Sequence, residues 1–380
     1  MKRCVVISDS FKGTLSSSQI CALARQAARR VSPELSLLAL PVADGGEGTV
    51  DCFLEACGGR WRRTEVFGPF GERVQAAYGL LPDGTAVVEC AAAAGLPLAE
   101  GRLDVMRATT YGVGQLIRDA LSKGAKRLVL GLGGSCTNDG GCGCAAALGV
   151  RFTDRTGAEF IPTGGTLEKI DRVDVSGLLP RLREIPLTVM CDIDNPLYGP
   201  DGAACVFAPQ KGADARQVQA LDRGLRHLAQ TIERCLGVDV SCLPGAGAAG
   251  GFGAGCVALL GGKLQSGIET VLDTVDFDGR VRGCDLVITG EGRLDSQSLG
   301  GKVVSGVARR CHRAGVPVVA VVGAVDLTAA ELHEAGLAGA VSINPAGMSF
   351  QQAREHAADF YENTLERLLR TVCAPDNRAE

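Results

Sequence analysis

Short runs of consecutive apolar residues recur along the chain, and longer amphipathic segments separate them. A strand that helices cover on both faces shows no alternation of apolar and polar residues, so such runs predict buried strands of a parallel sheet. Six runs have this character: residues 4–7, 35–42, 128–132, 286–289, 316–322 and 338–343. We expect most of them in one parallel sheet that is built from both ends of the chain.

Apolar residues at helical spacing fill the segments between these runs. In residues 15–30 the apolar positions recur every three or four residues, with Ser16 as a candidate cap and Pro33 beyond the end. Residues 303–311 and 329–335 are further candidates, and residues 357–372 carry one apolar stripe. Strands that alternate with helices are typical of an α/β fold.

The middle of the chain has a different pattern. Residues 64–67, 74–81 and 85–90 are separated by turn sequences, which predicts an antiparallel meander. Further strands are expected at 187–192 and 203–207. We therefore expect a Rossmann-like parallel-sheet domain (residues 1–62, 106–150 and 281–380) with a second, inserted mixed α/β domain (residues 63–105 and 151–280).

Composition excludes several classes of protein. The chain has 380 residues with 39 Lys and Arg against 43 Asp and Glu, a net charge of −4, and no block of like charge. Such a chain has no electrostatic surface for nucleic acid or an anionic membrane, and no apolar stretch long enough to span one. We expect a cytoplasmic protein whose 16 cysteines lack zinc spacing and mostly pack as small apolar residues.

Polar, glycine-rich loops follow several of the predicted strands, where ligands of parallel sheets bind. Asp9, Ser10 and Lys12 follow the first strand, and Asp44 stands among glycines after the second. Carboxylates and a lysine at such points suit an anion, a metal or a hydroxyl group, although capping of a helix would use the same residues.

Three more loops have the same character. Residues 131–141 combine glycines, hydroxyls and amides in a pattern that suits a phosphate cradle, although they match no Walker A motif. Glu291, Arg293 and Asp295 follow another strand, with Gly301-Lys302 beyond them. Asp192 follows the strand at 187–191 and is a candidate base or metal ligand.

Acids, lysines and glycine loops without a candidate His or Cys nucleophile favour phosphoryl transfer, which depends on positioning and electrostatic stabilisation. The run from Gly245 to Gly250 formally matches G-x-G-x-x-G, but no convincing strand precedes it. An NAD-dependent 2-hydroxy-acid dehydrogenase is therefore an alternative that the sequence disfavours, as is a non-catalytic binder of sugar acids.

The motifs together resemble those of the bacterial type I glycerate kinase family, which includes the glycerate 2-kinases. The matching segments are DSFKGTLS, VADGGEGT, TTYGVGQLI, GLGGSCTNDGG, CDIDNPL, VFAPQKGA, GAGAAGGFGAG, LQSGIE and DLVITGEGRLDSQSLGGK, which span nearly the whole chain. The resemblance implies two α/β domains and phosphorylation of D-glycerate with ATP and Mg²⁺. The expected product is 2-phosphoglycerate, with 3-phosphoglycerate as the alternative, and the expected assembly is a monomer or homodimer.

With that resemblance, each candidate residue receives a hypothetical role. Asp192 or Asp44 accepts the hydroxyl proton, and Lys12 and Arg293 hold the glycerate carboxylate near Asp9 and Ser10. Mg²⁺ or substrate hydroxyls are assigned to Glu291 and Asp295, with Asp44 as a further metal ligand. The ATP phosphates are assigned to the loop residues Gly133, Gly134, Ser135, Thr137, Asn138 and Asp139.

Two further expectations follow from the same resemblance. The two domains are expected to close over a cleft and exclude water. Cys136 and Cys142 stand where the family has small residues, which predicts an enzyme sensitive to thiol reagents.

Overall fold

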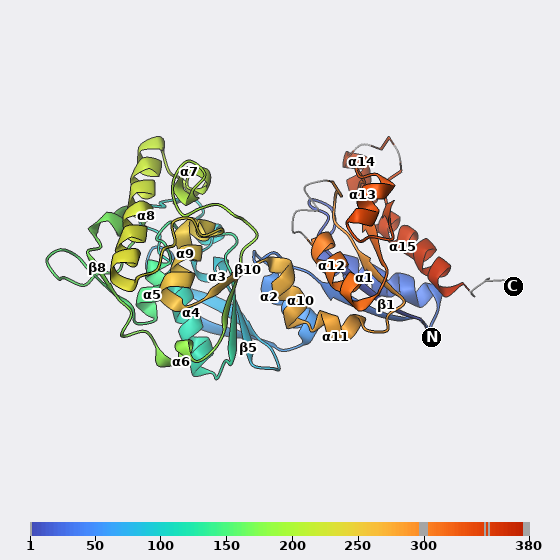
Figure 1. Cartoon of the computed structure of the whole chain (residues 1–380), viewed down its shortest axis with the longest axis horizontal. Helices are drawn as coiled ribbons and strands as arrows, with labels where there is room; N and C mark the ends of the chain where they lie inside the picture. Colours follow the sequence, from blue (N-terminus) through green and yellow to red (C-terminus); the bar gives the residue numbers. More distant parts are fainter. Residues whose placement is uncertain (1, 296–302, 346, 349, 375–380) are drawn as a thin grey trace. The chain divides into compact units, whose positions relative to one another are not determined.

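The structure is a computed structural model that describes residues 2–295, 303–345, 347–348 and 350–374, so Gly301 and Lys302 lie outside it. The chain divides into two units (Figure 1). Unit 1 contains Met1–Ala43 and Ile268–Glu380, and unit 2 contains Asp44–Gly267. The chain therefore passes from one unit to the other twice.

Unit 1 is built on a five-stranded parallel sheet with the strand order β13-β12-β11-β1-β2. Its strands are β1 (Arg3–Ser8), β2 (Ser36–Pro41), β11 (Leu286–Thr289), β12 (Val318–Val322) and β13 (Gly339–Ser342). In the centre of the sheet, β1 is in register with β11, with Cys4 opposite Leu286.

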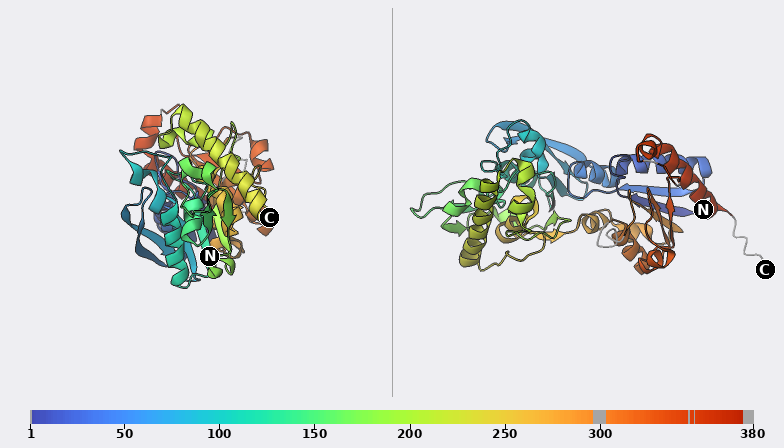
Figure 2. Two further views of the ribbon diagram at one scale, coloured as in Figure 1. Left: turned by 90° about the vertical axis from the view of Figure 1, so that its left-hand side faces the viewer. Right: turned by 90° about the horizontal axis from the view of Figure 1, so that it is seen from above.

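Helices cover both faces of this sheet. The helices of unit 1 are α1 (Ser17–Val31), α10 (Gly267–Thr274), α11 (Phe277–Val281), α12 (Val303–Ala314), α13 (Ala329–Glu334), α14 (Phe350–Glu355) and α15 (Ala357–Cys373). The chain moves outward in opposite directions from β1 to β2 and from β11 to β12, and right-handed crossovers then place α1 and α12 on opposite faces. Figures 1 and 2 show α15 beside α1, and Phe11 and Tyr361 pack edge to face in their shared core.

Unit 2 contains a six-stranded mixed sheet with the order β10-β9-β6-β5-β4-β3 and a small two-stranded antiparallel sheet of β7 and β8. Strands β10, β9, β6 and β5 are parallel, whereas β5, β4 and β3 form an antiparallel meander. The strands are β3 (Arg60–Phe67), β4 (Arg73–Leu80), β5 (Thr85–Glu89), β6 (Arg127–Gly131), β7 (Arg151–Thr153), β8 (Arg172–Asp174), β9 (Leu187–Met190) and β10 (Lys263–Gln265).

The α-helices of unit 2 are α2 (Thr49–Cys57), α3 (Ala91–Ala94), α4 (Tyr111–Ser122), α5 (Cys142–Ala147), α6 (Pro180–Arg183), α7 (Ala203–Phe207), α8 (Ala215–Leu236) and α9 (Ala248–Leu260). Single 3₁₀ turns lie at Leu96–Ala99, Gly164–Lys169 and Pro209–Lys211. The long helix α8 begins at Asp214, whose carboxylate caps it in a capping box with Gln217. No helix of the described residues is both long and apolar enough to cross a membrane.

The expected fold class is confirmed, since a parallel-sheet unit holds an inserted mixed α/β unit. Two expectations differ from the structure. The strand expected at 128–132 is β6, which lies inside the sheet of unit 2, so residues 106–150 belong to unit 2 and the expected boundaries shift to 43/44 and 267/268. The segment expected as a strand at 203–207 is the helix α7, because five apolar residues have no clear period.

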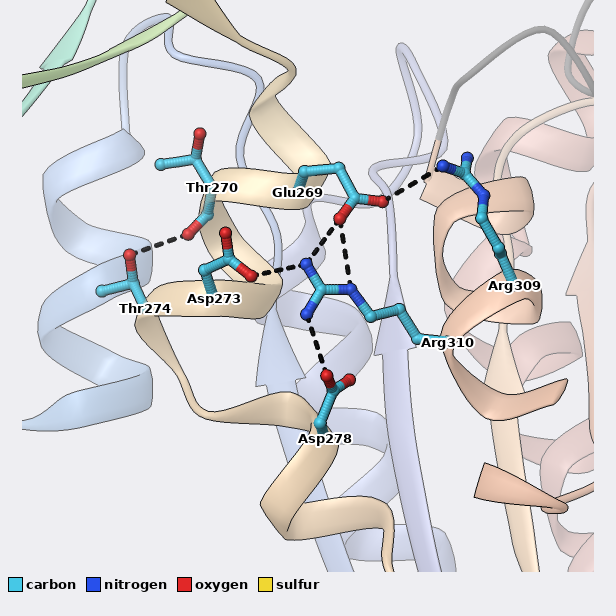
Figure 3. Close-up of polar contacts among 7 residues, drawn as sticks. All are labelled: Glu269, Thr270, Asp273, Thr274, Asp278, Arg309 and Arg310. Atoms are coloured by element: carbon cyan, nitrogen blue, oxygen red, sulfur yellow. Dashed lines mark hydrogen bonds and ion pairs between the residues drawn. The ribbon is translucent and has the colours of Figure 1, made fainter. Parts of the chain in front are cut away.

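A network of charged residues fixes α10 and α11 to α12 in unit 1 (Figure 3). Arg310 donates to Glu269 at 2.5 Å, to Asp273 at 2.5 Å and to Asp278 at 3.2 Å, and its side chain is 12% exposed. Arg309 lies 3.6 Å from the other oxygen of Glu269. Although burial lowers the pKa of Arg310, its hydrogen bonds to Glu269 and Asp273 raise that pKa above its ordinary value.

Candidate active site

A large cavity of about 930 Å³ opens in unit 1 at the carboxyl ends of the central strands. The sheet order reverses between β1 and β11, and the crevice at such a switch point is where open parallel sheets bind ligands. Two loops supply most of its polar groups: residues 9–14 follow β1, and residues 290–295 follow β11. The cavity thus brings together the expected residues Asp9, Ser10, Lys12, Glu291, Arg293 and Asp295.

The residues of the large cavity differ in how they are held. Asp9 accepts from the backbone N–H of Ser10 at 2.6 Å, which fixes the loop after β1. Glu291 is buried at the end of β11, whereas Lys12 is exposed. Arg293 already forms an ion pair with Asp326 at 2.9 Å, so its charge is partly compensated within the protein.

A small pocket of about 330 Å³ lies in unit 2 at the carboxyl ends of β6 and β9. The two candidate bases Asp44 and Asp192 line it together with Gly133, Gly134 and Ser135 of the loop after β6. Its apolar lining includes Leu96, Leu132, Met190, Ile193 and Phe207. The candidate base residues therefore share one pocket with half of the expected phosphate loop.

Close backbone packing explains the glycines around Asp44. The amide of Gly133 donates to the carbonyl of Gly45 at 3.0 Å. A side chain on Gly45, which has φ +88°, would come within 2.9 Å of the Cβ of Met190. These glycines allow the loop after β2 to lie against the ends of β6 and β9, which places Asp44 at the pocket.

Both candidate bases are exposed and oriented by backbone amides. Asp44 accepts from the N–H of Gly46 at 3.0 Å. Asp192 accepts from the N–H of Gly267 at 2.7 Å, at the start of α10. These hydrogen bonds hold one oxygen of each carboxylate, and both residues are exposed at the pocket.

Lys211 also lines the small pocket, and sequence reasoning did not single it out. Its side chain comes from the 3₁₀ turn after α7, is 3% exposed, and donates to Ser135 Oγ at 3.0 Å and to the carbonyl of Thr137 at 2.7 Å. Burial lowers the pKa of Lys211 to about 8, against smaller opposing effects of Cys90, Cys136 and Asp139. The only sequence feature that could have pointed to Lys211 is its place inside the motif VFAPQKGA, and a motif does not reveal whether its lysine is buried.

The second half of the expected phosphate loop lies in the interior of unit 2. Thr137, Asn138 and Asp139 are fully buried and do not line the pocket. The carboxylate of Asp139 accepts from the amides of Thr110, Gly141 and Gly143 and from the Thr110 hydroxyl. The carboxylate of Asp139 thus accepts from one amide of the expected loop, that of Gly141, and from groups of Thr110 and Gly143 outside it.

The glycine run at 245–251 supports the floor of the small pocket. Ala249, Gly250 and Gly251 are all left-handed, with φ of 51°, 67° and 88°, and Ala249 lines the pocket. Gly250 lies directly against the carbonyl of Thr137, where a side chain would clash. No strand leads into this segment, so it is a packing element rather than a dinucleotide loop.

The expected magnesium ligands are divided between the units. Glu291 and Asp295 line the large cavity, and Asp44 lines the small pocket. Among the described residues no group of three or more His, Cys, Asp or Glu is arranged to hold a metal. Mg²⁺ in kinases is held by one or two carboxylates together with substrate phosphates, so the pair in the large cavity fits such an ion.

Comparison with known proteins gives a consistent result. The model of the glycerate kinase family matches residues 4–373. The glycerate kinase of Bacillus subtilis (strain 168) is 43% identical over 97% of both chains. The glycerate 2-kinase of Escherichia coli (strain K12) is 44% identical over 89% of this chain and 90% of its own. A crystal structure from Salmonella typhimurium LT2, provisionally titled glycerate kinase 2, is 41% identical with a TM-score of 0.86 over 98% of both chains.

Proposed function

Because this chain belongs to the glycerate kinase family and is an enzyme of that type, we propose that it transfers the γ-phosphoryl group of ATP to the 2-hydroxyl of D-glycerate. The products are 2-phosphoglycerate and ADP. The E. coli relative is named a glycerate 2-kinase, which supports the choice of hydroxyl. Membership of a kinase family also argues against the alternative of an NAD-dependent 2-hydroxy-acid dehydrogenase.

One observation carries the allocation of the two substrates. A general base must lie within hydrogen-bond reach of the hydroxyl proton, and both candidate bases, Asp44 and Asp192, line the small pocket. We therefore assign D-glycerate to the small pocket. This reverses the sequence-based expectation, in which Lys12 and Arg293 hold the carboxylate and the loop after β6 holds the ATP phosphates.

The large cavity is the better site for the nucleotide. Its volume of about 930 Å³ is near the upper end of the roughly 300–1,000 Å³ of small-molecule sites, whereas the small pocket, at about 330 Å³, is near the lower end. Lys12 and Arg293 supply positive charge for phosphates there, and Glu291 and Asp295 would hold Mg²⁺. When bound, the ion would neutralise charge on the phosphates.

In the proposed step, Asp192 accepts the proton of the 2-hydroxyl of glycerate. At the same time the oxygen of that hydroxyl forms a bond to the γ-phosphorus of ATP. The bond between that phosphorus and the bridging oxygen of ADP breaks in line with the attack. Asp44 is the alternative base. Transfer requires that the two pockets present their substrates to each other, and this interdomain-cleft arrangement stays a prediction, as do the cytoplasmic location and the monomer or homodimer.

Phosphorus NMR tests the proposal directly. The purified protein is incubated with ATP, Mg²⁺ and D-glycerate, and the ³¹P spectrum is followed with time. We expect a 2-phosphoglycerate signal and ADP. A 3-phosphoglycerate signal would change the position of transfer, and the absence of any phosphorylated glycerate from a protein that consumes ATP with another hydroxy acid would contradict the substrate assignment.

A further inference from the structure

We infer that Lys211, together with the hydroxyl of Ser135, binds the carboxylate of the acceptor substrate in the small pocket. The inference rests on the proposed function and deepens it, because it names the residues that select a hydroxy acid over a neutral polyol. Lys211 would be a substrate-binding residue in direct contact with the acid rather than a support for the loop.

The geometry leaves donors available for a carboxylate. An ammonium group has three N–H donors, and Lys211 uses two of them, on Ser135 Oγ and on the carbonyl of Thr137. The hydroxyl of Ser135 accepts from Lys211, so its own hydrogen is directed elsewhere. One N–H of Lys211 and the O–H of Ser135 are thus neighbouring donors in the wall of one pocket, which suits the two oxygens of a carboxylate.

Within the described part of the chain Lys211 forms no ion pair, and the buried carboxylate of Asp139, which does not contact it, raises its pKa by less than burial lowers it. The side chain is 3% exposed. A buried charge without a partner is costly, and proteins retain such groups where a ligand supplies the opposite charge. A neutral amide donor could hold Ser135 and Thr137 at a lower cost, so a structural role alone does not account for an ammonium group here.

A carboxylate fits the surroundings better than a phosphate of the nucleotide. The pocket is small and its walls are partly apolar, with Leu96 and Phe207 among them. Asp44 and Asp192 line the same pocket, so an anion with a hydroxyl on the adjacent carbon would place that hydroxyl near a base. A carboxylate brings one negative charge next to these two acids, whereas a row of nucleotide phosphates seated in the pocket would bring several, which is more unfavourable.

Equilibrium binding separates this role from a structural one. We would measure the affinities for D-glycerate, its neutral amide glyceramide, and the non-hydrolysable nucleotide Mg·AMP-PNP by calorimetry with the full-length protein. In Lys211→Met we expect D-glycerate binding to weaken by about 10²-fold or more, since loss of one partner of a buried charge pair has effects of that size. Binding of glyceramide and AMP-PNP should change less than about threefold.

Matched variants serve as controls. Lys123→Met removes an exposed lysine of unit 2 and should leave all three affinities unchanged. Lys12→Met should weaken AMP-PNP and spare D-glycerate. If Lys211→Met leaves D-glycerate affinity within threefold, or weakens AMP-PNP instead, the inference is overturned, and the second result would place a nucleotide phosphate at Lys211.

A second measurement applies if Lys211→Met does not fold. An anion that pairs with Lys211 raises its pKa, so D-glycerate binding to the unmodified protein at pH 8.5 should take up a proton from the buffer, with no uptake at pH 6.5. Absence of uptake at pH 8.5 contradicts the inference. The proposed function is judged separately by the ³¹P experiment, so product formation with unaltered Lys211→Met binding would reject only the inference.

Discussion

Two buried cations of this protein have opposite surroundings. Arg310 in unit 1 meets three carboxylates, those of Glu269, Asp273 and Asp278 (Figure 3). Lys211 in unit 2 meets a hydroxyl and a carbonyl but no carboxylate. Arg310 joins α12 to α10 and α11 within its own unit, whereas Lys211 lines a pocket.

The comparison shows how charge balance distinguishes a structural cation from a ligand-binding one. The protein compensates the charge of Arg310 completely and leaves it nothing further to bind. Lys211 has two hydrogen bonds and the charge of Asp139 but no ion pair among the described residues, so part of the free-energy cost of its burial is left for a bound anion to offset. The difference leads to predictions about activity, stability and pH, in which the two regions respond in different ways.

The largest contrast is expected between two carboxylates, one from each region. Asp192→Asn should lower turnover with D-glycerate by about 10²-fold or more, because general base catalysis has effects of that size. Glu269→Gln, in the Arg310 network, should leave turnover unchanged. Steady-state kinetics with both variants, checked for folding by circular dichroism, tests this. Turnover near that of the unmodified enzyme would remove Asp192 from the role of base and direct attention to Asp44.

The two cations should affect stability with opposite signs. Arg310→Met leaves three carboxylates without their partner and should lower the free energy of unfolding by about 2 kcal/mol, less than for a fully buried pair because Asp273 and Asp278 are half exposed. Lys211→Met replaces a buried charge that has no ion pair by an apolar side chain of similar length. This change should raise the free energy of unfolding by about 1 kcal/mol. Urea unfolding measures both. A loss of stability in Lys211→Met would mean that Lys211 is mainly structural.

The next largest effect on stability is expected at Gly250, which packs against the Thr137 carbonyl that accepts from Lys211. Gly250→Ala introduces a side chain against the carbonyl that accepts from Lys211, whereas Gly261→Ala, at a similar left-handed φ of 71°, meets no atom within 4 Å. Both changes carry backbone strain, but only the first adds overpacking, worth about 1–3 kcal/mol. We expect Gly250→Ala to be the less stable by that amount and to raise the KM for D-glycerate. Equal effects would mean that the contact with Thr137 relaxes at no cost.

The pH dependence follows from the lowered pKa of Lys211, about 8. Cys90, Cys136 and Asp139 lie around this group, and Asp44 and Asp192 line its pocket. The protonated form binds the carboxylate, so kcat/KM for D-glycerate should fall about tenfold per pH unit above that pKa. Since the folded-state pKa is below the ordinary 10.5, the stability cost of this group is present below pH 8 and disappears as pH rises toward 10.5. Because an arginine stays protonated throughout this pH range, Lys211→Arg should not show the fall of kcat/KM at alkaline pH.

Thiol reagents should have the smallest effect, contrary to the expectation from the sequence. Cys136 and Cys142 are buried, and burial raises the pKa of Cys136 to about 11 and that of Cys142 well above its ordinary value. The thiolate is the reactive form, so both should resist alkylation. Mild iodoacetamide treatment should label the exposed Cys242 first and leave turnover unchanged. Mass spectrometry that finds Cys136 modified in parallel with lost activity would contradict this.

Hydrophobic pattern predicted the strands of unit 1 and its helices α1, α12, α13 and α15, but not α10, α11 or α14, nor every sheet partner. The run at 4–7 and the stripe at 357–372 became β1 and α15, because periodicity reports how much of each element is buried. The run at 128–132 has the same character in any parallel sheet, so its pattern could not tell which sheet β6 would join.

The sites were predicted in part for a similar reason. Polar loops after strands located both pockets, because strand ends place such loops together. The role predicted for Asp139 stays a prediction although its carboxylate is buried against backbone amides, and Lys211 was missed. A carboxylate that accepts from backbone amides and one that meets a ligand cannot be told apart in a sequence. Burial and counter-ions, which separate Asp139 and Lys211 from their neighbours, depend on tertiary packing.

The insertion of unit 2 between β2 and α10 sets the order in which a nascent chain can fold. Unit 2 is continuous from Asp44 to Gly267, whereas β1 cannot pair with β11 until Leu286 has left the ribosome. We expect the inserted unit to fold first during synthesis. Before β11 is synthesised, β1 has no partner strand on one side, and such an unpaired apolar strand edge is prone to aggregation. Chains truncated before residue 286 should therefore contain a folded unit 2 joined to an aggregation-prone N-terminal segment. Slow translation of the last third of the chain should increase the demand for chaperones.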